Sequence, residues 1–543
     1  MSQASVSGPA GEGSGTRPGW GAASAEPDPR RWMILVVIAV AQLMVVLDAT
    51  VMNIALPSAQ RDLGFSNVDR QWIVTAYSLS FGSLLLFCGR LADLLGRKVM
   101  FITGLTGFAV ASAVGGASVN FGMLVTARAC QGVFGACLAP AALSLLATTF
   151  TDPKERGKAF GIYGSVAAGG GAVGLLLGGA LTSYLSWRWC LYINLAFAGA
   201  AIIGALFFLK KQPKSGARLD VLGVVLVSTG VFCLVYGFSN AATHRWATPS
   251  TYGFLAVAVV LLLVFAFWMS RAKNPLLPPR VVLDRNRGAA YLGTLIVGAG
   301  MFGIFLFLTY YLQNTLHYSP VITGVAFLPM IAGIATGSNL SNIVLLPRIG
   351  PKPIISTGLV LAAASMAWYT RIGPTSTYVP DLLGPLIVGG LGFGLMFSTA
   401  FNTGTYGVRP QDTGVASASV NTGQQLGGSI GTALLNTIAT SATASYLLGH
   451  HGTGKPTAAL TQLALVHGYT TAFWWVAGIF LGGAVLCGSL MRSGPLGGRP
   501  DAAAAAPAVS ATAPASAAVP AAETGTAGSG AGAEPATPVT SPE

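Results

Sequence analysis

Charged residues are scarce in this sequence. Only 9% of its 543 residues are Asp, Glu, Lys or Arg, whereas 52% are hydrophobic. Soluble domains usually carry about a quarter of their residues as charged side chains. The composition therefore indicates a membrane protein, with the lipid bilayer as a predicted partner.

Cysteine and histidine are also few. The six cysteines fall in apolar runs without a C-x-x-C pair, and the five histidines lack the spacing of metal ligands. This argues against disulfides and metal sites, and we expect the cysteines to be small core residues. An enzyme would need a nucleophile, a metal cluster or paired acids. We therefore predict no enzymatic activity, no metal and no cofactor.

Long apolar runs, by contrast, recur along almost the whole chain. A helix needs about 20 mainly apolar residues to cross the hydrocarbon core of a bilayer, and fourteen runs meet this condition. The sequence thus predicts an all-α membrane protein with fourteen transmembrane helices. The predicted spans are 32–56, 71–88, 99–118, 122–148, 159–184, 189–209, 219–238, 252–270, 289–312, 321–345, 353–371, 380–402, 414–444 and 470–491.

Basic residues cluster on one side of these spans. With the N-terminus inside, most of the 30 Lys and Arg residues fall in cytoplasmic segments, such as Arg90 to Lys98 and Arg271 to Arg287. This follows the positive-inside rule and predicts a multi-pass protein of the cell membrane with both termini cytoplasmic. It also accounts for the net charge of +13, so we predict no nucleic-acid partner.

Two charged residues lie deep in predicted spans. Asp48 is the most deeply placed acid, and Arg128 is the only basic residue at such depth. A charge at the bilayer centre costs roughly 2.5 to 3.5 kcal/mol, so each should find a partner, water or backbone carbonyls. Burial favours the neutral acid, whereas hydration or a nearby Arg128 favours the carboxylate. Alternating exposure would let Asp48 take up and release a proton; the alternatives are an acid that only caps or packs, and an arginine that only bonds helix carbonyls.

Glycines recur at helical spacing in the fifth and thirteenth predicted spans. Such faces let another helix approach closely in membranes. Packing is the better-supported interpretation, and a direct role in gating is the alternative. The two ladders are Gly170, Gly174, Gly178 with Gly179, and Gly423, Gly427, Gly431.

The segment between the second and third predicted spans runs from Gly89 to Lys98. Its glycines allow a tight turn, and Asp93 can pair with Arg97 or cap a neighbouring helix. Gly96-Arg97-Lys98 is echoed by Gly350-Pro351-Lys352. The echo favours two related halves with a substrate site between them, although short Gly and Lys matches also recur by chance.

This segment resembles the signature loop of the major facilitator superfamily, whose members use it as a cytoplasmic latch between two halves. Other segments resemble motifs of its fourteen-span drug:proton antiporters, the second drug-antiporter family. Leu175 follows Gly174 where that family usually has proline, which weakens inferences about helix kinking more than the assignment. The further matching segments are Leu47–Pro57, Trp72–Leu79, Arg128–Gly132, Trp187–Asn194, Tyr311–Gly324 and Asn421–Gly428.

The resemblance implies a major facilitator fold of two six-helix bundles plus two extra linking helices, which we expect to shield the bundles from lipid. It also implies proton-coupled efflux by alternating access. Asp48 and Arg128 would carry proton coupling, and the latch would comprise Gly89, Asp93, Gly96 and Arg97. The expected regions are a disordered N-terminus (1–29), an N-terminal bundle (30–210), linking helices (211–287), a C-terminal bundle (288–492) and a disordered Ala/Pro-rich tail (493–543).

Aromatic and amide side chains in the predicted spans are candidates for the substrate cavity, since they suit bulky, largely apolar ligands. The alternative is that several face other helices or lipid headgroups. We expect the substrate to be a hydrophobic or amphiphilic drug or antibiotic, exchanged for protons by a monomer. An importer or uniporter of a small metabolite is the competing function. The cavity candidates are Gln42, Asn53, Tyr77, Gln131, Tyr163, Tyr310, Gln313, Asn402, Asn421 and Gln425.

Overall fold

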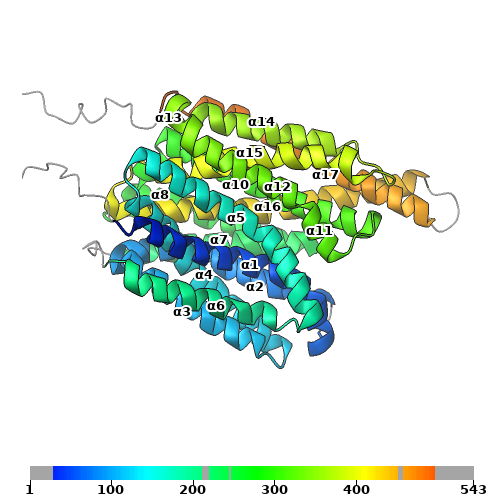
Figure 1. The fold of residues 1–543 in the computed structure, drawn as a ribbon, viewed down its shortest axis with the longest axis horizontal. Coiled ribbons are helices and arrows are strands. Elements are labelled where there is room, and N and C mark those ends of the chain that lie inside the picture. Colours follow the sequence, from blue (N-terminus) through cyan, green and yellow to red (C-terminus); the bar gives the residue numbers. More distant parts are fainter. Residues whose placement is uncertain are drawn as a thin grey trace, which may run out of the picture. The chain divides into compact units, whose positions relative to one another are not determined.

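The computed structural model describes residues 29–65, 67–210, 219–243, 246, 248–450 and 457–495. The predicted termini 1–28 and 496–543 lie outside this part. All regular structure within it is helical (Figure 1). The helices are α1 (Arg31–Leu63), α2 (Asn67–Leu95), α3 (Arg97–Gly116), α4 (Phe121–Thr149), α5 (Pro153–Tyr184), α6 (Trp189–Phe208), α7 (Val221–Thr243), α8 (Pro249–Arg271), α9 (Pro279–Val282), α10 (Arg285–Tyr310), η1 (Tyr311–Thr315), α11 (Pro320–Ala326), α12 (Leu328–Asn339), η2 (Leu340–Leu345), α13 (Leu346–Ile349), α14 (Pro351–Tyr369), η3 (Tyr378–Leu383), α15 (Gly384–Thr405), η4 (Pro410–Asp412), α16 (Thr413–His450) and α17 (Ala458–Leu490).

Each predicted apolar run falls on a helix. Within the described residues, twelve helical segments are long and apolar enough to cross a membrane. The predicted runs 353–371 and 414–444 coincide with α14 and α16, which are not among these twelve. The all-α membrane fold is confirmed, and the count of fourteen spans stays a prediction.

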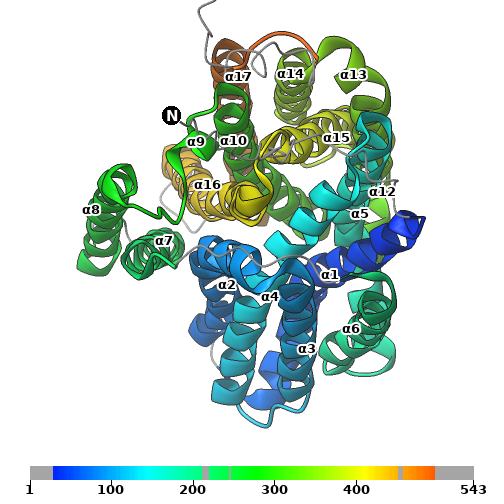
Figure 2. The same cartoon turned by 90° about the vertical axis from the view of Figure 1, so that its left-hand side faces the viewer.

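The helices gather into two groups with a separate pair at one side (Figure 2). In the first group α1 packs against α5 and α6, and α4 packs against α2 and α3. In the second, α10 packs against α16, and α14 against α15 and α17. We call these the N half (α1–α6) and the C half (α10–α17). Their sequence separation means that contacts between them arise only from tertiary folding.

Two seams join the halves: α2 packs on α16, and α5 packs on α12. Glycines make both approaches possible. A Cβ atom on Gly89 of α2 would lie 2.5 Å from the Ala418 side chain of α16, and one on Gly161 of α5 would lie 2.9 Å from the Asn339 amide of α12. The helices therefore meet backbone to backbone at positions where a side chain would separate them.

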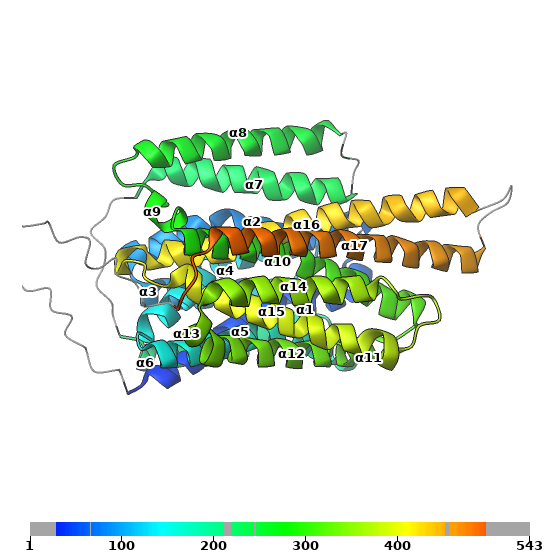
Figure 3. The ribbon, with the colours of Figure 1, turned by 90° about the horizontal axis from the view of Figure 1, so that it is seen from above.

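The pair α7–α8 covers the α2–α16 seam (Figure 3). The Thr75 hydroxyl of α2 lies 3.0 Å from the Ser239 hydroxyl of α7, and Trp246 Nε1 donates to Thr437 Oγ1 of α16 at 2.8 Å. On α8 the side chains of Leu263 and Phe267 are exposed. The pair thus contacts both halves and presents an apolar outer face, while its predicted shielding role stays a prediction.

Two local expectations were wrong. The segment from Gly89 to Leu95 continues α2 as a helix, because the ladder of backbone hydrogen bonds runs through to Gly96 and Ala92 and Asp93 are buried. Only Gly96 forms the turn, with φ +101°. Cys130 is exposed, whereas the other five cysteines are buried. Its position on α4 turns it away from the core that Arg128 and Gln131 enter.

The echo between Gly96 and Gly350 has a structural counterpart. Each glycine has positive φ, +101° and +77°, and each directly precedes a helix, α3 and α14 respectively. Positive φ is a conformation that favours glycine. The two positions therefore occupy equivalent turns, as expected for related halves.

Candidate functional site

Asp48 lies at the centre of a buried polar cluster inside the N half. Arg128 Nη1 donates to Asp48 Oδ2 at 2.5 Å, and Gln131 Nε2 donates to Asp48 Oδ1 at 3.0 Å. Asn194 Nδ2 donates to the same oxygen at 2.8 Å. Asp48 and Arg128 are only 1% and 2% exposed. The two charges predicted to lie deep in the membrane thus pair directly.

Ser112 closes the cluster from α3. Its hydroxyl accepts from Gln131 Nε2 at 2.7 Å and from Asn194 Nδ2 at 3.3 Å. The Arg128 guanidinium also lies 4.5 Å from the centre of the Tyr77 ring, so an aromatic face supplements its ion pair. Four of the six helices of the N half, α1, α3, α4 and α6, therefore contribute a hydrogen-bonding side chain to one group, and α2 adds the Tyr77 ring. We call Asp48, Arg128, Gln131, Asn194 and Ser112 the Asp48 cluster.

Close helix packing holds these side chains in place. A Cβ atom on Gly132 of α4 would lie 2.5 Å from the Tyr77 carbonyl oxygen of α2, which brings Arg128 and Gln131 against α2. At its start α4 is capped by Asn120, whose side chain accepts from Met123 N at 2.9 Å. The register of α4 is thereby set at its end and along its length.

The glycine ladder of α5 packs on α1 around Asp48. A Cβ atom on Gly170 would lie 2.9 Å from Val46, one on Gly178 would lie 3.0 Å from the Val51 backbone, and one on Gly174 would collide with Thr50. These glycines therefore let α5 pack closely on α1. The neighbouring Gly179 faces Val321 of α11 at 3.5 Å. The ladder therefore fixes α1, and with it Asp48, within the N half.

The chemistry available to the Asp48 cluster is that of one acid among hydrogen-bond donors. Three N–H groups point at the carboxylate oxygens. Hydrogen bonds and an adjacent cation favour the charged form, whereas burial favours the neutral acid. Within the described residues no group of three His, Cys, Asp or Glu could hold a metal ion.

Two cavity candidates meet at the boundary between the halves. Tyr163 of α5 donates its hydroxyl to Gln42 Oε1 of α1 at 2.8 Å, and its ring packs edge-on to Phe401 of α15, 6.1 Å between centroids. Tyr77 and Gln131 belong with the Asp48 cluster. These four cavity candidates come from α1, α2, α4 and α5, and their role in a substrate cavity stays a prediction.

Asn402 lies in a different environment, beside the buried Arg156 of α5. Arg156 Nε donates to Asn402 Oδ1 at 2.8 Å, and its Nη2 donates to Thr405 Oγ1 at 2.8 Å. Asn402 Nδ2 in turn donates to Asn342 Oδ1 at 2.9 Å. Both ends of the Asn402 amide are therefore occupied by contacts that join α5 to α15 and η2 near the ends of these helices.

The remaining cavity candidates are not brought together. Tyr310 is 43% exposed at the end of α10, and Asn421 Nδ2 donates to Ser417 O of its own helix. Gln313 and Gln425 are half-buried. The Asn53 side chain lies outside the described part. Their role in a cavity stays a prediction.

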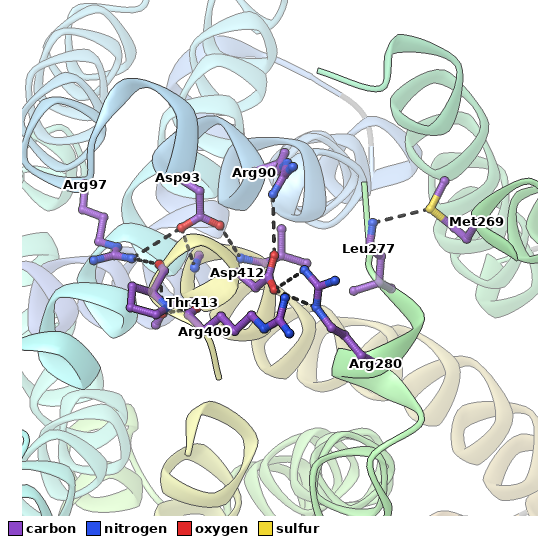
Figure 4. A network of polar contacts seen from close by, with 12 residues as sticks. Arg90, Asp93, Arg97, Met269, Leu277, Arg280, Arg409, Asp412 and Thr413 are labelled. Carbon is purple, nitrogen blue, oxygen red and sulfur yellow. Dashed lines mark hydrogen bonds and ion pairs between the residues drawn. The ribbon is translucent and has the colours of Figure 1, made fainter. Parts of the chain in front are cut away.

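The Gly89 to Arg97 segment connects the halves at the α2–α16 seam (Figure 4). Asp93 Oδ1 accepts from Gly414 N at 2.9 Å and Oδ2 accepts from Val415 N at 3.3 Å, at the start of α16. Arg97 lies 3.6 Å from Asp93 and donates to the Pro410 carbonyl. Asp93 therefore does both things expected of it, pairing with Arg97 and capping a neighbouring helix. The carboxylate meets the partial positive charge of the helix start.

A second acid, Asp412, extends this contact to the linking segment. Arg280 of α9 donates to Asp412 Oδ2 through Nη2 at 2.8 Å and Nε at 3.2 Å, and Arg90 of α2 lies 3.9 Å away (Figure 4). Asp412 is buried. The chain that follows α7–α8 is thus tied to the same seam as α2 and α16.

Several of these residues could not be singled out from the sequence. Asn194 and Ser112 are uncharged, and such residues are common in apolar helices. Arg156 stands in a short basic stretch, Lys154 to Lys158, that is typical of an exposed cytoplasmic segment, and Asp412 lies outside the predicted spans. A usable signal for Asn194 was its place in the Trp187–Asn194 motif. Burial of Arg156 carries no sequence signal, because its partners Asn402 and Thr405 lie far along the chain in α15.

Comparisons with known proteins agree with this geometry. Residues 38–432 match the sequence profile of the major facilitator superfamily. A puromycin resistance protein of Streptomyces alboniger is 51% identical over 87% of this chain and 93% of its own length. A cephamycin export protein of Amycolatopsis lactamdurans is 36% identical over 79% of this chain and 90% of its own length.

A tetracenomycin C resistance and export protein of Streptomyces glaucescens is 34% identical over 75% of this chain and 76% of its own length. Among solved structures, that of a human organic anion transporter superposes with a TM-score of 0.60 at 15% identity, covering 84% of this chain and all of the other. This likeness concerns the fold. Together these findings show that the chain belongs to the major facilitator superfamily and is a multi-pass membrane transporter related to antibiotic resistance and export proteins.

Proposed function

We propose that this transporter exports hydrophobic or amphiphilic antibiotics in exchange for protons, with Asp48 as the proton carrier and Arg128 as its electrostatic partner. The observation that carries the proposal is the Asp48 cluster, an acid 1% exposed that pairs with Arg128 at 2.5 Å inside the N half. An ionisable group at this depth is expensive, which favours a functional role. The named activities of the relatives support antibiotics as the substrate class.

In alternating access, the Asp48 cluster would exchange protons with each side of the membrane in turn. Both termini are cytoplasmic in this proposal, supported by the basic segments at the ends where α2 meets α16. Asp93 and Arg97 hold that side closed, and Asp48 then exchanges protons with the outside. When the latch opens, the same acid exchanges protons with the cytoplasm. The N half (30–210), the linking segment (211–287) and the C half (288–492) are the moving parts.

Puromycin is the first substrate to test, because the relative with 51% identity is named for resistance to it. Purified protein in liposomes should accumulate puromycin against its gradient when a pH gradient is imposed, and an uncoupler should abolish accumulation. Asp48→Asn should remove proton-driven transport while leaving the protein folded. Asp62→Asn is the matched control, since Asp62 lies on the same helix in a half-exposed surface pair with Arg188.

Three outcomes separate the alternatives. Full proton-driven transport by Asp48→Asn would remove this acid from the mechanism. Transport of puromycin only down its own gradient would indicate a uniporter. Accumulation of puromycin in the same direction as the proton flow would indicate an importer. Cephamycin and tetracenomycin C serve as second and third substrates if puromycin is not moved.

A further inference from the structure

The orientation of one amide in the Asp48 cluster carries information about the proton. Asn194 turns its Nδ2 toward two oxygens, Asp48 Oδ1 at 2.8 Å and Ser112 Oγ at 3.3 Å. Its Oδ1 is buried and, among the described residues, has no hydrogen-bond partner. The amide is therefore satisfied at one end only, and that end faces the acid.

This orientation matches what an ionised Asp48 requires of its neighbours, namely hydrogen-bond donors. A carboxylate accepts hydrogen bonds and donates none, so the amide oxygen could not replace Nδ2 at 2.8 Å without repulsion between two acceptors. A protonated carboxyl group reverses the requirement, because its O–H needs an acceptor. A buried donor left without one costs free energy.

We propose that Asn194 is a positioning residue for the proton on Asp48: its amide donates to the ionised carboxylate and turns over to accept from the protonated acid. This inference rests on the proposed role of Asp48. A half turn of the amide exchanges Oδ1 for Nδ2 at the point between Asp48 and Ser112. The two lone pairs of Oδ1 then accept from the Asp48 O–H and the Ser112 O–H. In the orientation seen, the far Oδ1 accepts from no described donor, so no hydrogen bond at that end is broken when the amide turns.

The two other residues that donate to Asp48, Arg128 and Gln131, cannot perform this exchange. Arg128 carries donors only, and the Gln131 amide is held at both ends, since Oε1 accepts from Arg128 at 2.8 Å while Nε2 donates to Asp48 and Ser112. Turning Gln131 would place its N–H groups against the Arg128 guanidinium. Asn194 is therefore the one amide of the Asp48 cluster that can serve both protonation states.

Few other groups bear on the titration of Asp48. Arg128 approaches it from α4, Tyr77 from α2 and Cys190 from α6. The glycine ladder of α5 and Ser112 of α3 bring no titratable group. A phenol and a thiol are ordinarily neutral at pH 7, so Arg128 is the single charge that accompanies Asp48 in the cluster.

Infrared difference spectroscopy of the protein in liposomes tests the proposal without a drug. Acidification should produce a carboxylic C=O band that Asp48→Asn lacks. Asn194→Leu removes a charge-assisted hydrogen bond from the ionised form and a neutral one from the acid, and the first is about twice as strong. The band should therefore persist to higher pH, by about one unit, a tenfold change in proton affinity. Its frequency should also rise, because the acid has lost its acceptor.

The controls distinguish failure of this inference from failure of the proposed function. Asn240→Leu is the same substitution on α7, where the amide donates to Ser250 and Thr251. It should leave the carboxylic band of Asp48 unchanged. Absence of any Asp48-dependent band in the parent would overturn Asp48 as proton carrier. A parent band whose midpoint and frequency are both unaltered in Asn194→Leu would overturn the amide exchange alone.

A second measurement covers the case in which Asn194→Leu does not fold. Isotope-labelled asparagine gives amide bands that can be followed in the parent protein. Acidification should shift one of these bands in the parent and leave it in place in Asp48→Asn. An identical response in both proteins would contradict the exchange, because the asparagine would then not respond to the proton on Asp48.

Discussion

The molecule buries two arginines in opposite ways. Arg128 pairs with a carboxylate at 2.5 Å, and both residues belong to the N half. Arg156 has no acidic partner among the described residues, and its bonds to Asn402 and Thr405 cross to the C half. The neighbouring Glu155 pairs instead with Arg31 at 2.7 Å. One arginine is thus neutralised within a half, and the other is held by neutral groups between halves.

The difference follows from what each contact must do. Separating a buried ion pair leaves two uncompensated charges, which is strongly unfavourable. Separating a guanidinium from amide and hydroxyl oxygens and admitting water replaces one set of neutral acceptors by another, at little net cost. Under the proposed mechanism, an ion pair suits a cluster that stays together while its proton changes. Under the same proposal, neutral acceptors suit a seam that opens and closes during transport.

The largest effect should come from breaking the ion pair. Arg128→Met leaves Asp48 buried without its cation and should lower the free energy of unfolding by about 3 to 5 kcal/mol. Adding Asp48→Asn should restore most of that stability without restoring transport. Thermal unfolding of the two variants in detergent measures the difference. A double variant no more stable than the single one would mean that the pair is not the source of the loss.

A smaller effect is expected at Arg156. Arg156→Met leaves Asn402 Oδ1 without its donor, which should weaken closure of the α5–α12 seam by about 1 to 3 kcal/mol. A buried reporter, Ser341→Cys, should then react faster with a water-soluble maleimide in a Cys130→Ser background. If Arg156→Met destabilised the fold as much as Arg128→Met, the proposed difference between the two buried arginines would be contradicted.

The seam can also be tested sterically. A Cβ atom on Gly157 would collide with the Asn342 carbonyl oxygen, whereas nothing lies within 4 Å of one on Gly199. Gly157→Ala should disfavour the closed seam by about 1 to 3 kcal/mol and slow transport, and Gly199→Ala should change neither. Transport rates and labelling of Ser341→Cys provide the measurement. Equal behaviour of the two alanine variants would show that close approach at Gly157 is dispensable.

The smallest effect should arise at Arg280. Its side chain is 50% exposed although it bonds to the buried Asp412, so Arg280→Gln should cost less than about 1 kcal/mol. Any loss of transport should shrink further at high salt, because exposed pairs are screened. A large, salt-independent loss would instead assign α7–α8 a part in opening the seam.

The site was partly predictable because charge is rare in apolar helices. Asp48 and Arg128 stand out on that ground alone, and Asp93 stands out through the glycines beside it. Asn194 and Ser112 do not, since uncharged polar residues are tolerated in spans without a function. Arg156 was misleading, because a basic residue in a basic segment indicates exposure to the cytoplasm. It is held instead by Asn402 and Thr405, far away along the chain.

The sequence by itself determined the local features of each helix. These are apolar runs long enough to span a bilayer, glycines at helical spacing, and a few charges in definite positions. These are local properties, and they follow from the cost of exposing polar groups to lipid. Only the tertiary structure decided which glycine face meets which helix, and whether a buried charge finds a carboxylate or a neutral acceptor. Those outcomes depend on contacts between segments hundreds of residues apart, such as Asp93 with Gly414, which no local pattern specifies.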